Sequence, residues 1–422
     1  MNRAVAPGKP ARHPTMAFRE RIDQLHRQSA ARVLGLLVAR FRQFDRAEDA
    51  LAEAFEQAVR VWPEQGWPNQ PEAWLYQVAV RAELDRQKHR AVHQRIAPIL
   101  QSDDAVEHDE PITERDQRLA MFFLCAHPSL SVDTQALLIL RYCALVPTAN
   151  IAQAFLLDVE TATRRLHRAK TKLELTGVSF AAPDRVDWAY RLPPVLAALE
   201  VLFDQSYADL GGGREAESLA RDAMQLTLTL IELMPDEPEV LGLASLMCFC
   251  ESRRPARLDD SGHMVSLDEQ DTTRWHTSLI RRGAPYLKRA STFGKPGPYQ
   301  WRAAIHAAHA RRLELGETPW ADIVQGYRML AVLDDSPMVQ INLALAEARI
   351  NQHEQAWLRF QAIDGKPLRH FRPYVLAEAE LLWQRGEREH ACERLALAAL
   401  LPGGHAETAF INTKLSGWRQ GS

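Results

Sequence analysis

Cationic side chains are concentrated in one short stretch of the chain. Residues 160–173 hold five Lys and Arg residues against one acid, although the net charge of the whole chain is -3. Partner choice depends on where charges lie rather than on their sum. Guanidinium and ammonium groups bind phosphate oxygens, and those that reach base edges discriminate between bases. The stretch therefore predicts nucleic-acid binding.

The residues around this cluster have the pattern of a helix-turn-helix. Residues 147–155 predict a short helix, residues 156–158 a turn, and residues from Val159 to about Leu173 a second helix, which Asp158 can cap. One apolar stripe collects Ile151, Ala152, Phe155, Ala162, Leu166, Ala169 and Leu173. The opposite face carries Glu160, Thr161, Thr163, Arg164, Arg165, His167, Arg168, Lys170 and Lys172. Such a helix fits the major groove, and the alternative is a surface helix with a solvated cationic face.

Helical periodicity over most of the chain predicts an all-α protein. Apolar residues recur at helical spacing from Phe18 to Trp62, and strand-like alternation is nearly absent. Residues 62–71 contain three prolines and one glycine, which predict a break in the helix at Trp62. The helix is expected to resume at Glu72 and to end near His93.

Composition divides the chain into several segments. Residues 1–16 are expected to be a disordered leader. Residues 96–117 are expected to be a flexible linker, because residues 101–116 hold seven acids and one Arg. Residues 118–176 form the second helical unit, and residues 177–422 are rich in Ala and Leu, with helices separated by Pro or Gly.

Two segments of this long C-terminal part are alike. They begin at Pro337 and Pro373, which are 36 residues apart, close to the ~34-residue period of tetratricopeptide helix pairs. Segments that begin at Pro238 and Pro298 are weaker copies. The spacing predicts a helical solenoid.

Several kinds of site are not expected. The five cysteines form no CxxC pair and no zinc spacing, so we expect buried free thiols in a reducing cytosol. No apolar run reaches the ~18 residues that span a membrane, and we expect a cytoplasmic protein. His306 and His309 are spaced to touch a metal, but their apolar neighbours favour a packed helix face. No nucleophile, base and orienting group come together, so we expect neither an enzyme nor a cofactor or metal site.

Four linked segments resemble regions 2 and 4 of extracytoplasmic-function sigma factors. They are residues 45–58, 74–86, 151–155 and 165–170, in the order and at the separations of that family. The remaining chain, including residues 235–243 and 268–275, is similar to the subgroup with a tetratricopeptide-like C-terminal extension. The resemblance implies a region 2 domain over residues 17–95, a region 4 helix-turn-helix over residues 118–176, and the extension over residues 177–422.

This resemblance implies promoter-specific initiation of transcription with core RNA polymerase. Region 2 would bind the polymerase clamp and the −10 element, and region 4 would bind the −35 element and the polymerase flap. The acids expected to face the clamp are Asp45, Glu48, Asp49, Glu53 and Glu56. The alternative for these acids is a solvated charged face.

The resemblance also assigns the DNA contacts. The loop after Trp62 lies where such factors capture an extruded base, so Trp67 and Asn69 offer a stacking surface and an amide. For Trp62, the alternative is a place in the helical core. The cations expected on phosphates near the −10 element are Arg81, Arg86, Lys88 and Arg90, with Arg81 where many relatives have Asn. At the −35 element we expect base contacts from Glu160, Thr161, Thr163 and Arg164, and phosphate contacts from Arg165, Arg168 and Lys170.

Two functions remain open at this point. In the first, the chain is a sigma factor whose partners are core polymerase and promoter DNA, and whose extension regulates or completes its activity, for example by docking on the sigma domains. In the second, it is a helix-turn-helix regulator with a tetratricopeptide-like scaffold that acts without core polymerase.

Overall fold

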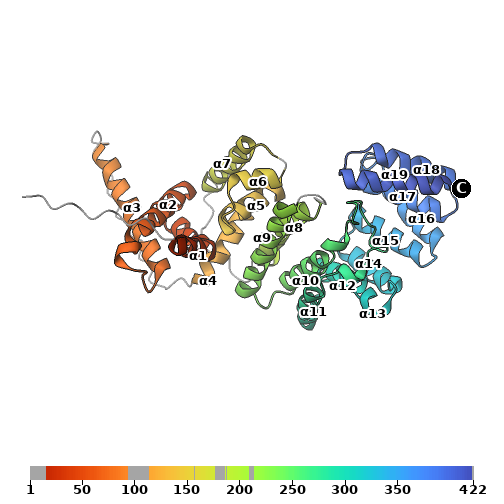
Figure 1. The fold of residues 1–422 in the computed structure, drawn as a ribbon, viewed down its shortest axis with the longest axis horizontal. Coiled ribbons are helices and arrows are strands. Elements are labelled where there is room, and N and C mark those ends of the chain that lie inside the picture. Colours follow the sequence, from red (N-terminus) through yellow and green to blue (C-terminus); the bar gives the residue numbers. More distant parts are fainter. Residues whose placement is uncertain are drawn as a thin grey trace, which may run out of the picture. The chain divides into compact units, whose positions relative to one another are not determined.

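The computed structural model describes residues 16–93, 114–155, 157–175, 186, 188–208 and 213–420, and these residues are mostly helical (Figure 1). In this part of the chain the one β interaction is an isolated antiparallel bridge between Leu258 and Met264. The all-α prediction is therefore confirmed. The predicted leader, except Met16, and the predicted linker up to residue 113 lie outside the described residues.

The chain divides into two compact units, Met1–Val201 and Leu202–Ser422. The division falls inside helix α8 (Trp188–Ala208), whereas the change in composition lies near residue 177. Arg191 on α8 donates through Nη2 to the Phe123 carbonyl oxygen at 3.1 Å, which fixes the first half of α8 on the first unit.

Three long helices open the first unit: α1 (Met16–Phe41), α2 (Phe44–Gln65) and α3 (Pro71–His93), which pack against one another. Leu37, Ala54 and Leu75 are fully buried among them. The predicted break at Trp62 was wrong by three residues, because Pro63 is accommodated inside the last turn of α2. The helix ends at Gly66, where a φ of 88° suits glycine and the N–H donates to the Trp62 carbonyl oxygen.

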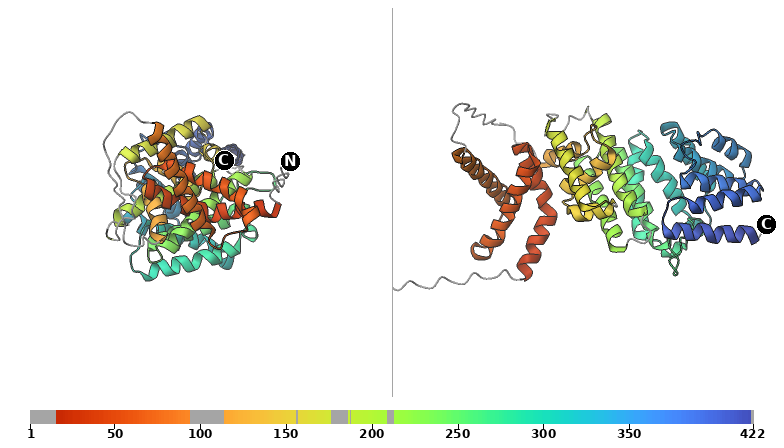
Figure 2. Two further views of the ribbon diagram at one scale, coloured as in Figure 1. Left: turned by 90° about the vertical axis from the view of Figure 1, so that its left-hand side faces the viewer. Right: turned by 90° about the horizontal axis from the view of Figure 1, so that it is seen from above.

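The second helical group of this unit begins at α4 (Glu114–Cys125). Residues 114–117 were predicted to be linker but form the first turn of α4, where acidic residues are favourable. Next come α5 (Val132–Leu138), a single π-helical turn (Ile139–Cys143), α6 (Thr148–Ala154) and α7 (Val159–Leu175). Figure 2 shows the helices of each unit from two further directions.

The second unit consists of consecutive helices that contact their neighbours in sequence. They are α9 (Gly213–Leu233), α10 (Pro238–Ser252), α11 (Thr277–Thr292), α12 (Pro298–Ala310), α13 (Arg312–Leu315), α14 (Trp320–Leu333), α15 (Pro337–Arg349), α16 (His353–Gln361), α17 (Arg372–Gln384), α18 (Arg388–Leu400) and α19 (His405–Gln420). Pro238, Pro298 and Pro337 are the first residues of α10, α12 and α15, where a proline loses no hydrogen bond.

Helix α10 is buried on almost every side. It contacts α9, α11 and α12. Gly242 makes the contact with α12 possible, because a Cβ at this position would lie 2.8 Å from the Gln300 backbone nitrogen. Further along, α15 pairs with α16 and α17 pairs with α18, and all four helices share one core around Ala344, Phe360 and Val375.

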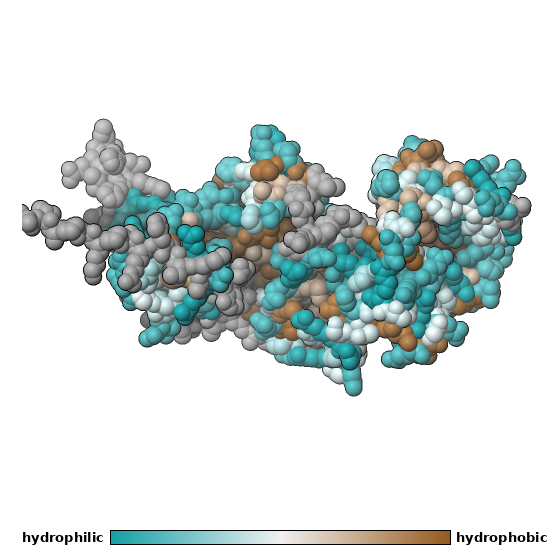
Figure 3. All heavy atoms as spheres, viewed as in Figure 1, coloured by the Kyte–Doolittle hydropathy of each residue, from teal (hydrophilic) through white to brown (hydrophobic). Residues whose placement is uncertain are grey.

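Hydrophobic patches on the surface are separated by hydrophilic side chains in the view of Figure 3. Among the described residues, no helix is both long enough and apolar enough to cross a membrane.

Candidate nucleic-acid interface

Helices α6 and α7 occupy the residues that were predicted to form a helix-turn-helix. Asp158 caps α7: its Oδ1 accepts the Thr161 backbone N–H at 2.7 Å, and its Oδ2 accepts the Thr161 hydroxyl at 2.7 Å. These hydrogen bonds lower the pKa of the Asp158 carboxyl below its ordinary value. The carboxylate thus remains ionised and orients the N-terminal end of α7.

The predicted apolar stripe is the buried face of this motif. Ala162, Leu166, Ala169 and Leu173 are buried on α7 and face α5 and α6. On α6, Ile151 and Ala152 are buried as well. Phe155, just after α6, is only half-buried. This packing leaves the opposite face of α7 at the surface.

The exposed face of α7 carries most of the predicted −35 contacts. Glu160, Thr163, Arg164, Arg165 and Arg168 are exposed, and Thr161 is half-buried by its contacts with Asp158. Arg164 contacts residues of its own helix: Nη2 donates to the Thr161 hydroxyl at 3.3 Å, and Nη1 lies 3.9 Å from Glu160 Oε1. Within the described part of the chain, Arg165 and Arg168 make no hydrogen bond or ion pair. These two guanidinium groups are available to phosphates without breaking an existing contact.

Lys170 differs from the other cations of α7. Its Nζ pairs with Asp45 and lies 3.9 Å from Glu48 Oε2, both at the start of α2. The Lys170 side chain is only 13% exposed, so a phosphate contact would have to replace this pairing.

Glu48 holds the two helical groups of the first unit together. It pairs with Arg141 of the π-helical turn, and its Oε2 accepts the Tyr142 hydroxyl at 3.2 Å. The Tyr142 ring packs on Phe44 with ring centroids 4.6 Å apart, and both rings are fully buried. Burial and the Glu48 carboxylate raise the pKa of Tyr142 far above its ordinary value. Sequence patterning did not identify Arg141, Tyr142 or Phe44, because the first two lie in an apolar run and Phe44 lies between polar residues, in both cases without a motif.

The remaining predicted clamp-facing acids line an open depression on α2. Asp49 and Glu56 are exposed and Glu53 is half-buried, and the depression is completed by Ala52, Gln57, Arg60 and Arg86. Arg86 donates through Nη2 to Glu53 Oε2 at 2.5 Å and to the Asp49 carbonyl oxygen at 3.2 Å. The predicted acidic face is therefore divided: Asp45, Glu48 and Glu53 pair with other side chains of the unit, and Asp49 and Glu56 are exposed.

The tryptophans of the predicted base-capture loop form an aromatic cluster. Trp62 is buried, and its ring lies 4.6 Å from Trp67 and 5.1 Å from Trp74 in edge-to-face contacts. The Arg21 guanidinium lies 4.1 Å from the Trp67 ring centre. The core interpretation of Trp62 is confirmed. Trp67 is half-buried, and a base could stack on it only beside or in place of Arg21.

The other residues predicted to contact the −10 element differ in their exposure and in their partners. Asn69 and Arg81 are exposed, whereas Arg86 is engaged with Glu53. The side chains of Lys88 and Arg90 lie outside the described residues.

His306 and His309, considered above as metal ligands, belong to a buried group in the second unit. His306 Nδ1 lies 2.6 Å from Arg253 Nη2, and the His309 ring packs edge-on against Trp320. In the described part of the chain, no group of three or more His, Cys, Asp or Glu residues is arranged to hold a metal ion. Both histidines thus lie on a packed helix face.

These two histidines predict a loss of stability in mild acid. Burial, reinforced by Arg253, lowers the pKa of His309 to about 3 and lowers the pKa of His306 well below its ordinary value, with Arg302 contributing to the His306 shift. Unfolded histidine titrates near pH 6.5, so below that pH the unfolded state binds more protons and the free energy of unfolding falls. We expect the contribution of each histidine to this fall to grow as the pH decreases and to approach about 1.4 kcal/mol per pH unit near pH 5. Urea unfolding between pH 7 and pH 5 measures this slope, and a double His306→Gln/His309→Gln variant with the same slope would contradict it.

Comparisons with known proteins found one family model and one protein that are similar to this chain. Residues 191–291 match the model of a family of unknown function (DUF6596). An uncharacterized protein of Rhizobium meliloti (strain 1021) is 31% identical over 390 residues, which is 90% of this chain and 92% of that protein. No solved structure matches the chain. The identity extends over nearly the whole of both proteins, and the chain belongs to the same family as this protein of Rhizobium meliloti.

Proposed function

We propose that the chain is a sigma factor of the extracytoplasmic-function type, which binds core RNA polymerase and directs it to promoters. The observation that carries this proposal is the capped helix α7, whose exposed face presents Arg164, Arg165 and Arg168 beside the polar side chains of its first turn. A helix-turn-helix reads bases with the N-terminal residues of its second helix and holds phosphates with later cations. The exposed residues of α7 follow this order.

The acidic depression on α2 supports the polymerase contact. Asp49, Glu53 and Glu56 lie on one side of α2 and border solvent, which suits a basic helical surface such as the polymerase clamp. A DNA-binding regulator that acts alone has no need of an acidic surface beside its DNA-binding helices, because phosphates repel it.

The proposal requires the two helical groups of the first unit to separate. Asp45 and Glu48 belong to the proposed clamp surface, and Lys170 belongs to the proposed −35 surface, yet they pair with each other. Polymerase and DNA would each have to compete with these ion pairs. Free chain would therefore bind either partner less tightly than an opened chain.

The helices of the second unit support a tetratricopeptide-like extension. The α15–α16 and α17–α18 pairs follow each other with a common core, and each first helix has a proline in its first turn, Pro337 as the first residue of α15 and Pro373 as the second residue of α17. We propose that this extension regulates or completes the activity of the sigma domains.

Two single substitutions test the proposal by separating its two contacts. Asp49→Arg reverses an exposed charge in the depression, and we expect it to weaken binding to core polymerase about tenfold or more while DNA binding is kept. Arg164→Ala removes a proposed base contact and should weaken DNA binding by about 1 to 3 kcal/mol while polymerase binding is kept. Gel filtration with core polymerase measures the first affinity, and fluorescence anisotropy with promoter DNA measures the second.

Glu393→Arg is the matched control, since it makes the same charge reversal at an exposed position of α18. It should change neither affinity. Wild-type chain that binds DNA but never core polymerase would instead support the regulator without polymerase.

A further inference from the structure

Arg253, at the end of α10, is a buried arginine without an acidic partner among the residues that the structure describes. Its side chain is 3% exposed, and Nη2 contacts His306 Nδ1 at 2.6 Å and Cys250 Sγ at 3.9 Å. Nε and Nη1 are also buried, and neither has a hydrogen-bond partner among the described residues. Arg372, which is equally buried, shows the usual solution: its Nη1 pairs with Glu407 Oε2 at 3.0 Å.

Two acids on neighbouring elements have other partners. Glu251 pairs with Arg254 at 2.7 Å, and Asp334 pairs with Arg302 at 2.9 Å. The histidines beside Arg253 are neutral, because burial and the guanidinium itself lower their pKa. Within the described part of the chain, Arg253 thus contacts the polar atom of an imidazole and forms no ion pair.

This arrangement is unfavourable unless an anion completes it. A guanidinium does not lose its proton in proteins, so Arg253 cannot become neutral as a buried Lys or His can. A buried charge without a counter-charge carries a large desolvation penalty, and buried N–H groups without acceptors add to it. An oxyanion would supply both the charge and the acceptors.

We propose that Arg253 binds an oxyanion, the class that includes carboxylates and phosphates, through Nε and Nη1. His306 is the positioning residue, because its Nδ1 accepts from Nη2 and holds the plane of the guanidinium. This site belongs to the second unit and does not depend on the function proposed above.

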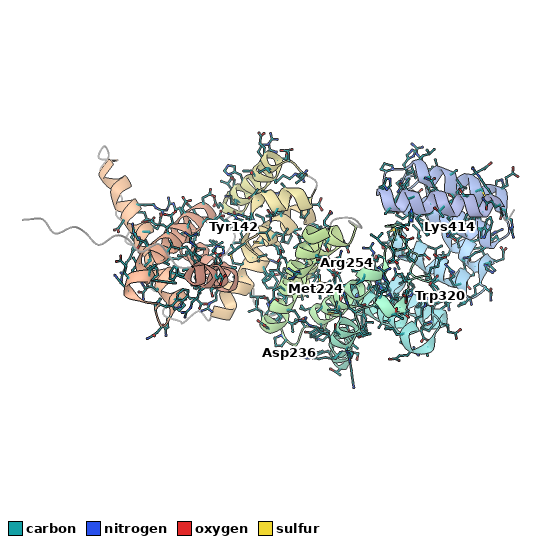
Figure 4. The ribbon with its side chains drawn as sticks, viewed as in Figure 1. Tyr142, Met224, Asp236, Arg254, Trp320 and Lys414 are labelled. Atoms are coloured by element: carbon teal, nitrogen blue, oxygen red, sulfur yellow. The ribbon has the colours of Figure 1, made fainter. Side chains whose placement is uncertain are left out.

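The segment between α10 and α11 borders Arg253. It leaves α10 at Arg253 and returns beside it, where the His276 backbone N–H donates to the Ser252 carbonyl oxygen at 2.8 Å. Between these points the chain forms two short 3-10 turns and one isolated bridge, and further backbone hydrogen bonds tie it together, among them that from the Val265 N–H to the Arg257 carbonyl oxygen at 2.8 Å. Trp275, at the point of return, is buried and its Nε1 also lacks an acceptor in the described structure. Figure 4 labels Arg254, next to Arg253, and Trp320, whose ring contacts His309.

Calorimetric titration of the full chain at pH 7 tests the site, with sodium phosphate in one arm and sodium acetate in the other. We expect one anion per chain in at least one arm, and the arm that binds identifies phosphate or carboxylate as the ligand class. The same anion should raise the melting temperature by about 2 °C or more over sodium chloride at equal ionic strength. Absence of binding and of any such rise in both arms would overturn the proposal.

Arg253→Met should abolish both effects, and it should melt no lower than wild type when no anion is added, since it removes an unpaired buried charge. Arg289→Met is the matched control, because Arg289 is exposed and contacts the Pro235 carbonyl oxygen and Asp236. It should bind the anion as wild type does.

If Arg253→Met does not fold, Arg253→Lys keeps the charge but loses the planar donors, and anion affinity should fall at least tenfold. Equal anion binding by wild type and the Arg253 variant would show that the anion binds elsewhere.

Discussion

Replacing Arg165 and Arg168 together with alanine should reduce the affinity of the chain for promoter DNA and weaken its dependence on salt. Both side chains are exposed on α7 and make no hydrogen bond or ion pair with the described residues. Each phosphate that a cation neutralises adds roughly −0.9 to the slope of log K against log salt concentration. The slope of the double variant should therefore be less negative by about 1.8, with an affinity at least about tenfold lower at low salt.

The folding of the double variant should not change. Substitutions of exposed side chains without partners usually alter stability by no more than about 0.5 kcal/mol. The double variant Arg281→Ala/Lys288→Ala is the control, since it removes two exposed cations from α11. Fluorescence anisotropy at several salt concentrations gives the slope, and an unchanged slope in the α7 variant would show that α7 does not contact phosphates.

The largest effect on stability is expected at Glu347 in the second unit. Its carboxylate is fully buried and accepts hydrogen bonds from Arg328 Nη2 at 3.0 Å and from Arg359 Nε at 2.9 Å. Replacing both arginines with methionine leaves a buried carboxylate without a counter-charge. Breaking a buried pair in this way costs about 3 to 5 kcal/mol.

Adding Glu347→Leu to that double variant should restore most of the stability, because an apolar group then replaces the unpaired charge. Arg311→Met is the comparison: Arg311 pairs with Asp322 at 2.5 Å, but both side chains are about half exposed. Its loss should cost no more than about 1 kcal/mol. Urea unfolding followed by circular dichroism measures all three variants, and a triple variant no more stable than the double would contradict this account.

Local features of the fold could be predicted because they depend on neighbouring residues. The 3.6-residue period placed Ala162, Leu166, Ala169 and Leu173 on one buried face, and the capping preference of aspartate identified Asp158. Pro298 and Pro337 likewise predicted the starts of α12 and α15, because a proline at the first position of a helix loses no hydrogen bond. Pro63 misled the prediction, since one proline near the end of a helix removes few hydrogen bonds and leaves the helix intact.

Contacts between distant segments could not be predicted in this way. Lys170 pairs with Asp45 across 125 positions of sequence, and Arg141 pairs with Glu48 across 93. Lys170, Asp45 and Glu48 have the pattern of solvated surface charges, and Arg141 stands in an apolar run. They come together where Phe44 packs on Tyr142. Likewise, Arg253 and Arg254 are adjacent in sequence, and patterning alone does not indicate that the first lacks an acidic partner while the second pairs with Glu251.

Binding of the chain to purified core RNA polymerase tests the proposed function. We expect a complex of one chain per core enzyme, which then retains promoter fragments that neither component retains alone. Asp49→Arg should weaken this complex and Glu393→Arg should not. Failure of the wild-type chain to associate with core polymerase at micromolar concentrations, with DNA binding intact, would contradict it.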